Sequence, residues 1–280
     1  MHRADCGRDA GSAPAFHVVQ LTSHGACCHA PPAARAAQQN AGLEDLGLDA
    51  ARRLELELCQ TRGVPLRAAA ICGLLAPVTF VAGLVLGDVA QPDGFSPAND
   101  DISDLGARTA DQAWLYNQFA ANLSGLLIVA FALGLWGALG SGWLARLGVV
   151  GLAILGVTRF LEGFLRLDCR GMDEGCDNMS WRADAHRVES GIASALFFLV
   201  PPLLAFAFRR IPEWRDLWLP TLLAVPVVVA ASVVFSAIGD GAAVRAASIT
   251  WFLWLGLLAW RLLRVADGKV AGRMAEASDS

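Results

Sequence analysis

The chain has 280 residues, of which 55% are hydrophobic and only 17% are charged. A soluble domain of ordinary composition carries about 25% charged residues, so this chain has too few to cover a surface that faces water. Its net charge is −4, so no basic field indicates binding to nucleic acid. These features predict an integral membrane protein.

Residues 1–63 are rich in Ala, Arg, Gly and His, and we expect them to form a disordered cytosolic tail. Within this tail, residues 42–60 alternate Leu with charged residues at helical spacing, which predicts a short amphipathic helix. The histidines of the tail are irregularly spaced. Their pattern therefore favours a low-complexity segment over a metal site.

Six apolar runs follow, each near the length of about 20 residues that crosses a bilayer. They lie at about 68–89, 118–139, 145–166, 187–208, 217–238 and 246–264. We therefore predict an all-α bundle of six transmembrane helices within residues 64–266, followed by a cytosolic C-terminal tail at 267–280. Arginines gather before the first run, in the second and fourth connections and after the last run. The positive-inside rule then places both termini in the cytosol, and we expect a multi-pass protein of the plasma membrane.

Two of the non-cytosolic connections are long and polar. The second, at 167–186, contains Cys169 and Cys176. If this loop faces an oxidising compartment, the pattern favours a disulfide that closes a small ring over two free thiols.

Several ionisable residues lie within the runs, near their non-cytosolic ends. Arg159, Glu162 and Arg166 share one helix face, with Glu162 between the two arginines, and His186 and Glu189 share a face of the next helix. Asp240 and Arg245 lie at the start of the last run. Because polar groups that face lipid are costly, these side chains should point inward and form a polar pocket open to the outer face. An alternative interpretation is structural, with a buried ion-pair ladder that holds the helices in register.

A motif and three single residues carry a family resemblance. Asn99-Asp100-Asp101-Ile102-Ser103-Asp104-Leu105-Gly106-Ala107 follows the first run, Asn117 opens the second, Asp168 follows the third and His186 starts the fourth. In this order, over about residues 67–264, the chain resembles the multi-pass membrane family called domain of unknown function 998, found mainly in bacteria and archaea. The resemblance implies that Ser103, Asp104, Asn117, Asp168 and His186 occupy signature positions, but it names no reaction. The family often has a proline shortly before the aspartate after the third span, whereas this chain has Leu165-Arg166-Leu167 there.

Three functions are compatible with this pattern. The first is an outer-leaflet lipid hydrolase or transferase, in which His186 is the general base, Asp168 or Glu189 orients it, and Arg159 or Arg245 binds an anionic headgroup. The second is a sensor or scaffold that binds a membrane lipid or small amphiphile without changing it, since no complete catalytic constellation is visible. The third is transport, which the restriction of polar residues to one half of the helices disfavours.

We expect neither a metal nor a cofactor. The predicted bundle contains a single histidine, whereas a catalytic zinc usually takes three protein ligands, so carboxylates would have to supply the rest. The chain also lacks the glycine-rich motifs that cradle phosphates in nucleotide-binding proteins.

Overall fold

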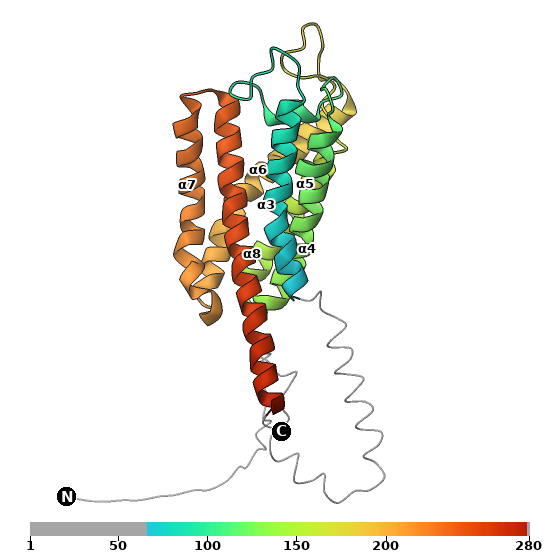
Figure 1. The fold of residues 1–280 in the computed structure, drawn as a ribbon. Coiled ribbons are helices and arrows are strands. Elements are labelled where there is room, and N and C mark those ends of the chain that lie inside the picture. Colours follow the sequence, from blue (N-terminus) through green and yellow to red (C-terminus); the bar gives the residue numbers. More distant parts are fainter. Residues whose placement is uncertain (1–65, 279–280) are drawn as a thin grey trace, which may run out of the picture. The chain divides into compact units, whose positions relative to one another are not determined.

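The computed structural model describes the backbone of residues 66–278 and the side chains of residues 66–268. The expected amphipathic helix at residues 42–60 and the tail histidines lie outside the described residues. Within the described range every regular element is a helix, and six helices are long and apolar enough to cross a membrane (Figure 1). For the described residues, the prediction of an all-α fold with six helices able to span a membrane is thereby confirmed.

Each observed span overlaps one of the six apolar runs, but α6 and α8 begin about six residues earlier than predicted, and α8 continues through the residues predicted to form a tail. The first span is α3 (Leu66–Val89), and the second joins the π-helical η3 (Tyr116–Leu123) to α4 (Ser124–Ala138). The remaining spans are α5 (Trp143–Glu162), α6 (Trp181–Phe208), α7 (Trp218–Ser236) and α8 (Asp240–Ser278); the short 3₁₀ helices η2 (Ile102–Gly106) and η4 (Pro212–Leu217) lie in connections.

One boundary differs from the prediction in a way that matters for the site. The helix α5 ends at Glu162 with Gly163 as its C-cap, whereas the apolar run was expected to continue to residue 166. Arg166 therefore lies in a loop and does not share a helix face with Arg159 and Glu162. The expectation that Glu162 lies between two arginines on one face was wrong in this respect.

The six spans form a ring in chain order. Each helix packs against the next, and α8 packs against α3. Figure 1 shows the connections 90–115, 163–180 and 237–239 at one end of the bundle, which we call the loop end. The connections 139–142 and 209–217 lie at the other end, which we call the opposite end.

Glycines allow some of these helices to approach each other closely. A methyl group added at Gly125 in α4 would lie 2.5 Å from the backbone nitrogen of Phe160 and 2.6 Å from the carbonyl oxygen of Gly156, both in α5. One added at Gly83 in α3 would lie 2.3 Å from the backbone nitrogen of Ala120. Because small residues let backbones touch, they provide the packing contacts that hold helices together in lipid.

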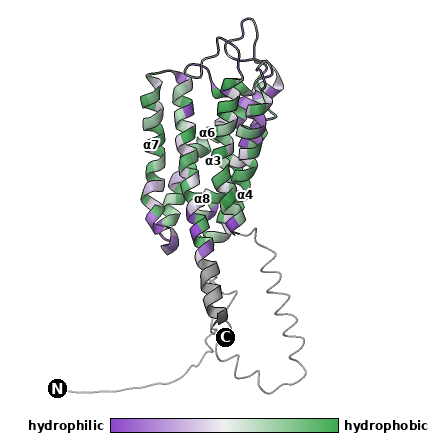
Figure 2. Cartoon of the chain, viewed as in Figure 1, coloured by the Kyte–Doolittle hydropathy of each residue, from purple (hydrophilic) through white to green (hydrophobic). Residues whose placement is uncertain are grey.

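The polar and apolar residues are separated along the bundle. Figure 2 shows hydrophobic helix surfaces between hydrophilic ends, and large apolar side chains are exposed along the spans, as contact with lipid requires. Among the described residues, the buried polar side chains belong to the loop half of the bundle, with the exception of Thr221 near the start of α7. The loop half of the interior is therefore the place to look for a site.

Candidate functional site

The centre of the loop half holds an ion pair in a hydrogen-bonded group. Arg159 pairs with Glu162 one turn further along α5. The hydroxyl of Tyr116, from η3, donates to Oε1 of Glu162 at 2.8 Å and accepts from Nη2 of Arg159 at 3.2 Å. The three side chains thus share one charge-neutral network between the second and third spans.

The guanidinium of Arg159 has a partner at each of its three nitrogens. Besides the bonds to Glu162 and Tyr116, its Nε donates to the carbonyl oxygen of Ala120 at 3.3 Å, and its Cζ lies 4.9 Å from the ring centroid of Phe80 in α3. The charge of Arg159 is therefore already paired with Glu162, which disfavours a role in binding an anionic headgroup. The pairing fits the structural interpretation of Arg159 and Glu162.

His186 and Glu189 lie beside this network on α6 and are less well satisfied. The two side chains are 8% and 5% exposed, and Nδ1 of His186 is 3.9 Å from Oε2 of Glu189. Within the described part of the chain, neither of these two atoms has a hydrogen-bond partner. The other ring nitrogen of His186, Nε2, lies 3.5 Å from Oγ of Ser190. Buried polar atoms without partners are costly, so their presence makes this pair a candidate for binding a ligand.

A narrow crevice leads from His186 to the loops. Five segments line it: η2, η3, the end of α5, the second loop and the start of α6. Its walls are Ser103, Gly106, Tyr116, Asn117, Glu162, Leu165, Arg166, Leu167 and His186. In this form it leaves no room for a water molecule. Ser103, Asn117, Glu162 and His186 were candidate site residues from the sequence, and the structure places them around one space.

The Ile102–Gly106 motif forms the roof of this crevice. Nδ2 of Asn117 donates to the carbonyl oxygen of Gly106 at 3.1 Å, and the buried carboxylate of Asp104 accepts from the backbone nitrogen of Gly171 at 3.1 Å. Burial raises the pKa of Asp104 above its usual range. Asp104 and Asn117 therefore fasten the first loop to the second loop and to η3.

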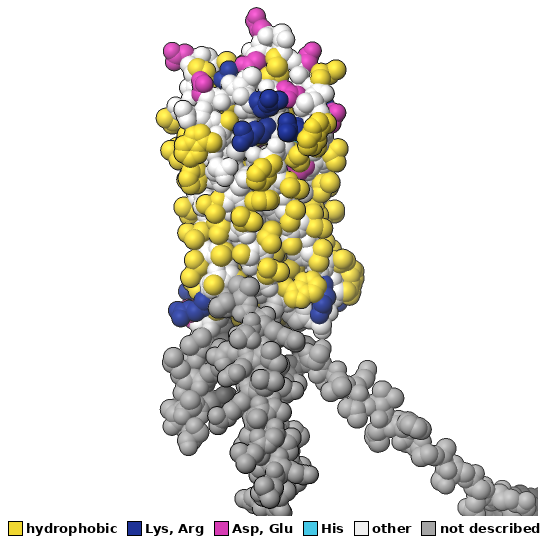
Figure 3. All heavy atoms as spheres, turned by 90° about the vertical axis from the view of Figure 1, so that its right-hand side faces the viewer, with side chains coloured by type: hydrophobic (Ala, Val, Ile, Leu, Met, Phe, Trp, Pro, Cys, Tyr) yellow, Lys and Arg dark blue, Asp and Glu magenta, His cyan; other side chains and the backbone are white. Residues whose placement is uncertain are grey.

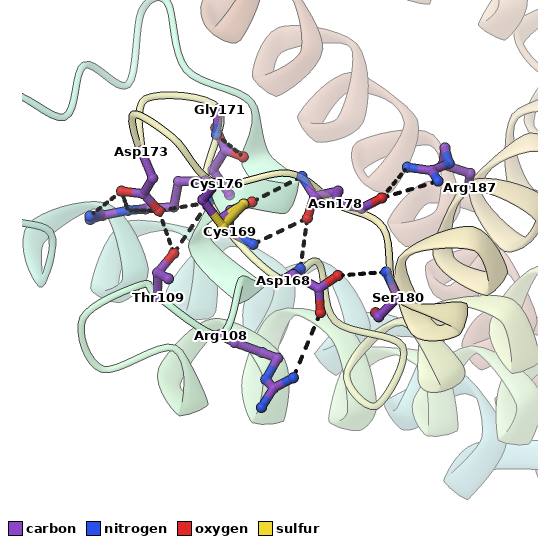
Figure 4. The surroundings of a disulfide bond; sticks show 12 residues. Arg108, Thr109, Asp168, Cys169, Gly171, Asp173, Cys176, Asn178, Ser180 and Arg187 are labelled. Atoms are coloured by element: carbon purple, nitrogen blue, oxygen red, sulfur yellow. Dashed lines mark hydrogen bonds and ion pairs between the residues drawn. A yellow bond between two sulfur atoms is a disulfide. The ribbon is translucent and has the colours of Figure 1, made fainter.

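Asp168 lies in the second loop, between Arg108 and Ser180 (Figure 4). Its Oδ2 accepts from the backbone nitrogen of Ser180 at 2.9 Å, and its Oδ1 lies 3.7 Å from Nη1 of Arg108. The bond from Ser180 holds the pKa of Asp168 below its usual range. Because Ser180 is the N-cap of α6, Asp168 fixes where that helix begins. Among the described contacts, none joins Asp168 to His186.

The structure joins Cys169 and Cys176 by a disulfide, which closes a small ring in the second loop (Figure 4). Arg170 and Asp173 form an ion pair at 2.8 Å inside this ring, and Thr109 of the first loop donates to the same carboxylate. These bonds, led by the one from Arg170, lower the pKa of Asp173 to about 2. The ring is thus fastened to the first loop.

The two candidates from the last span do not join the crevice. Arg245 makes a two-pronged ion pair with Asp88 at the end of α3, with distances of 2.7 and 3.3 Å, and donates to the carbonyl oxygen of Asp100 at 2.8 Å. Asp240 is exposed at the start of α8. Arg245 is therefore a second engaged arginine, which attaches the first loop to α3 and α8.

Reasoning from the sequence missed Tyr116. It is the only tyrosine in the chain, and it directly precedes Asn117 at the start of a span. That position next to a signature residue was the signal that could have identified it. Tyr116 is the first residue of the π-helical segment η3. Short π-helical segments often mark functional positions.

Fold and site together define a multi-pass membrane protein with six spans and a polar group buried at the loop end. The model of a family described as a protein of unknown function (DUF998) matches residues 74–261, so the chain belongs to that family. No curated protein and no solved structure matches the chain.

Proposed function

We propose that this protein binds the polar group of a membrane lipid or another small amphiphile in the crevice below its loops. The observation that carries the proposal concerns His186, which lines the crevice, and Glu189, whose Oε2 lies 3.9 Å from Nδ1 of His186. Each of these two buried atoms lacks a hydrogen-bond partner among the described residues. In lipid-embedded protein such groups are expensive, so they mark functional positions. Because the described crevice is too narrow for water, binding requires the segment Leu165–Leu167 to move away from Ser103 and His186.

The proposal places the loop end outside the cytosol and both termini inside, in the plasma membrane. The distribution of arginine supports this orientation. Arginines such as Arg67, Arg146, Arg209 and Arg264 lie near the opposite end, whereas the first loop contains five aspartates against Arg108. The disulfide in the second loop also suits an oxidising compartment.

The experiment is to purify the full chain in mild detergent and identify retained amphiphiles by native mass spectrometry. We expect a retained species in the wild type and its loss in His186→Ala. Ser236→Ala is the matched control, since Ser236 is exposed on α7 and bonds only within its own helix. Equal melting temperatures would exclude misfolding as the cause. A wild type that retains no amphiphile would overturn the proposal.

A second candidate function is catalysis on the bound lipid. The specific observation in its favour is that Ser103 and His186 line the same crevice, while Glu189 lies 3.9 Å from the imidazole of His186. In this version Glu189 orients the base, because Asp168 is held by Ser180 and Arg108. Lipid profiles of cells expressing the wild type, His186→Ala or Glu189→Gln test it. Identical profiles in all three strains would reject catalysis and leave binding.

A further inference from the structure

A second cavity, which shares Arg166 with the crevice, opens on the side of the bundle at the loop end. Its volume is about 280 Å³, and its walls are Arg108, Gly163, Phe164, Arg166 and Arg182. We call it the arginine cavity. Its three cationic side chains come from the first loop, the second loop and the first turn of α6.

The positive charge of this cavity is poorly compensated. Arg108 has one carboxylate nearby, that of Asp168 at 3.7 Å, and that carboxylate already accepts the amide of Ser180. Within the described residues, Arg166 and Arg182 form no ion pair: Arg166 contacts the carbonyl oxygen of Gly163 at 3.4 Å, and Arg182 lies over the ring of Trp181. Three guanidinium groups line one cavity while only Arg108 has a carboxylate nearby, so an anion among them would reduce their mutual repulsion.

The loops hold these arginines in place. The backbone nitrogen of Arg108 donates to the carbonyl oxygen of Leu167 at 3.0 Å, which ties the first loop to the second beside the cavity. Asp168 contacts Arg108 and also accepts from the backbone nitrogen of Ser180, the N-cap of α6. Arg182 is the second residue of that helix, so this bond helps to fix its position. The signature aspartate is thus a positioning residue for the arginine cavity.

The cavity lies where a lipid headgroup would be. Figure 3 shows Lys and Arg side chains gathered at the loop end, directly against the border of the hydrophobic belt. The apolar wall of the cavity, Phe164, is 53% exposed, and Leu161 and Val157 continue an exposed apolar row from it along α5. Charge and hydrocarbon therefore meet at this point, as they do in a phospholipid.

We propose that the arginine cavity binds the phosphate group of an anionic membrane lipid, whose acyl chain lies along Phe164, Leu161 and Val157. A volume of about 280 Å³ is at the lower end for ligand pockets, so it fits a headgroup and leaves the chain outside. Guanidinium groups bind phosphate with paired, charge-assisted hydrogen bonds. The inference rests on the proposed lipid-binding function and deepens it, because Arg166 also lines the crevice and connects the two sites.

The experiment measures lipid preference of the full chain by native mass spectrometry, with phosphatidylglycerol and phosphatidylcholine as probes. We expect about tenfold tighter binding of the anionic lipid, since a hydrogen bond between charged groups contributes about this factor. Arg166→Gln combined with Arg182→Gln should remove the preference. Arg187→Gln is the matched control, because Arg187 is exposed on the same turn region of α6 and pairs with Asp184 outside the cavity. High salt should weaken the preference in the wild type.

Each result decides the proposal. Equal binding of both lipids by the wild type, or a preference that survives the double substitution, would overturn it. Displacement of phosphatidylglycerol by inorganic phosphate at similar concentrations would assign the cavity to free phosphate and would also overturn the lipid assignment. Failure here is separable from failure of the proposed function, because His186→Ala should lose the crevice ligand and keep the headgroup preference.

Discussion

Nδ1 of His186 lies 3.9 Å from Oε2 of Glu189, and within the described residues neither atom has a hydrogen bond. Glu162, buried to a similar degree on the adjacent helix, has both carboxylate oxygens bound, one by Arg159 and the other by Tyr116. One interior therefore contains a satisfied carboxylate and an unsatisfied one. Replacing each of the two glutamates by glutamine should therefore affect the stability of the protein differently.

Glu162→Gln should destabilise the protein by about 3 kcal/mol, because it leaves the buried charge of Arg159 without its partner. Glu189→Gln should be neutral or stabilising, because it removes a buried carboxylate that has no partner for Oε2. Melting temperatures of the two variants in detergent, measured by tryptophan fluorescence, test both. A loss in Glu189→Gln as large as that in Glu162→Gln would contradict the contrast.

Gly125→Ala should destabilise the bundle by about 1–3 kcal/mol, the usual range for overpacking. The added methyl group would meet backbone atoms of Phe160 and Gly156, which cannot rotate away as a flexible side chain could. Gly137→Ala is the control in the same helix, since nothing lies within 4 Å of a methyl group there. It should be neutral or gain up to about 1 kcal/mol from helix propensity. Equal melting temperatures for the two variants would contradict the close contact of α4 with α5.

Local sequence patterns predicted the spans and the pairs within one helix. Six spans follow from runs of about 20 apolar residues, and the pairing of Arg159 with Glu162 follows from a spacing of three residues on a helix. The end of α5 was missed by four residues, because the apolar run continues through Phe164 and Leu165 after Gly163 has ended the helix.

Partners from different helices could not be read from one sequence. Tyr116 meets Glu162 across 46 positions, and Arg245 meets Asp88 across 157 positions. Such pairs depend on how each helix is rotated about its axis, and hydropathy does not determine that rotation. For the same reason the sequence did not predict that Arg245 pairs with a carboxylate or that Arg108, Arg166 and Arg182 line one cavity.

Loss of the disulfide should loosen the second loop. Replacing Cys169 and Cys176 together by Ser, or reducing them, should cost about 2–3 kcal/mol, as the closure entropy of a ring this small predicts. Hydrogen exchange should rise in residues 167–180 and stay unchanged in α7. Cys72→Ser is the control, because Cys72 is a free thiol within α3. Unchanged exchange in the loop after reduction would show that the bonds of Asp173 with Arg170 and Thr109 hold it without the disulfide.

Asp173 makes the stability of this loop depend on acid pH. Its pKa falls from the usual 3.8 to about 2, chiefly because Arg170 donates to its carboxylate. The folded state binds the proton less readily than the unfolded state, so the stabilisation is complete above about pH 4 and disappears as the pH falls toward 2. Asp173→Asn should therefore lower the melting temperature at pH 6, and its difference from the wild type should shrink between pH 4 and pH 2.

The control for this titration is Glu174→Gln, an exposed neighbour in the same ring without a hydrogen bond among the described contacts. It should match the wild type at every pH. Asp104 has a raised pKa, so its contribution to stability falls as the pH rises. It is present in both the wild type and Asp173→Asn, so the difference between these two proteins reports on Asp173. A difference between wild type and Asp173→Asn that is constant from pH 6 to pH 2 would show that the ion pair with Arg170 does not form in solution.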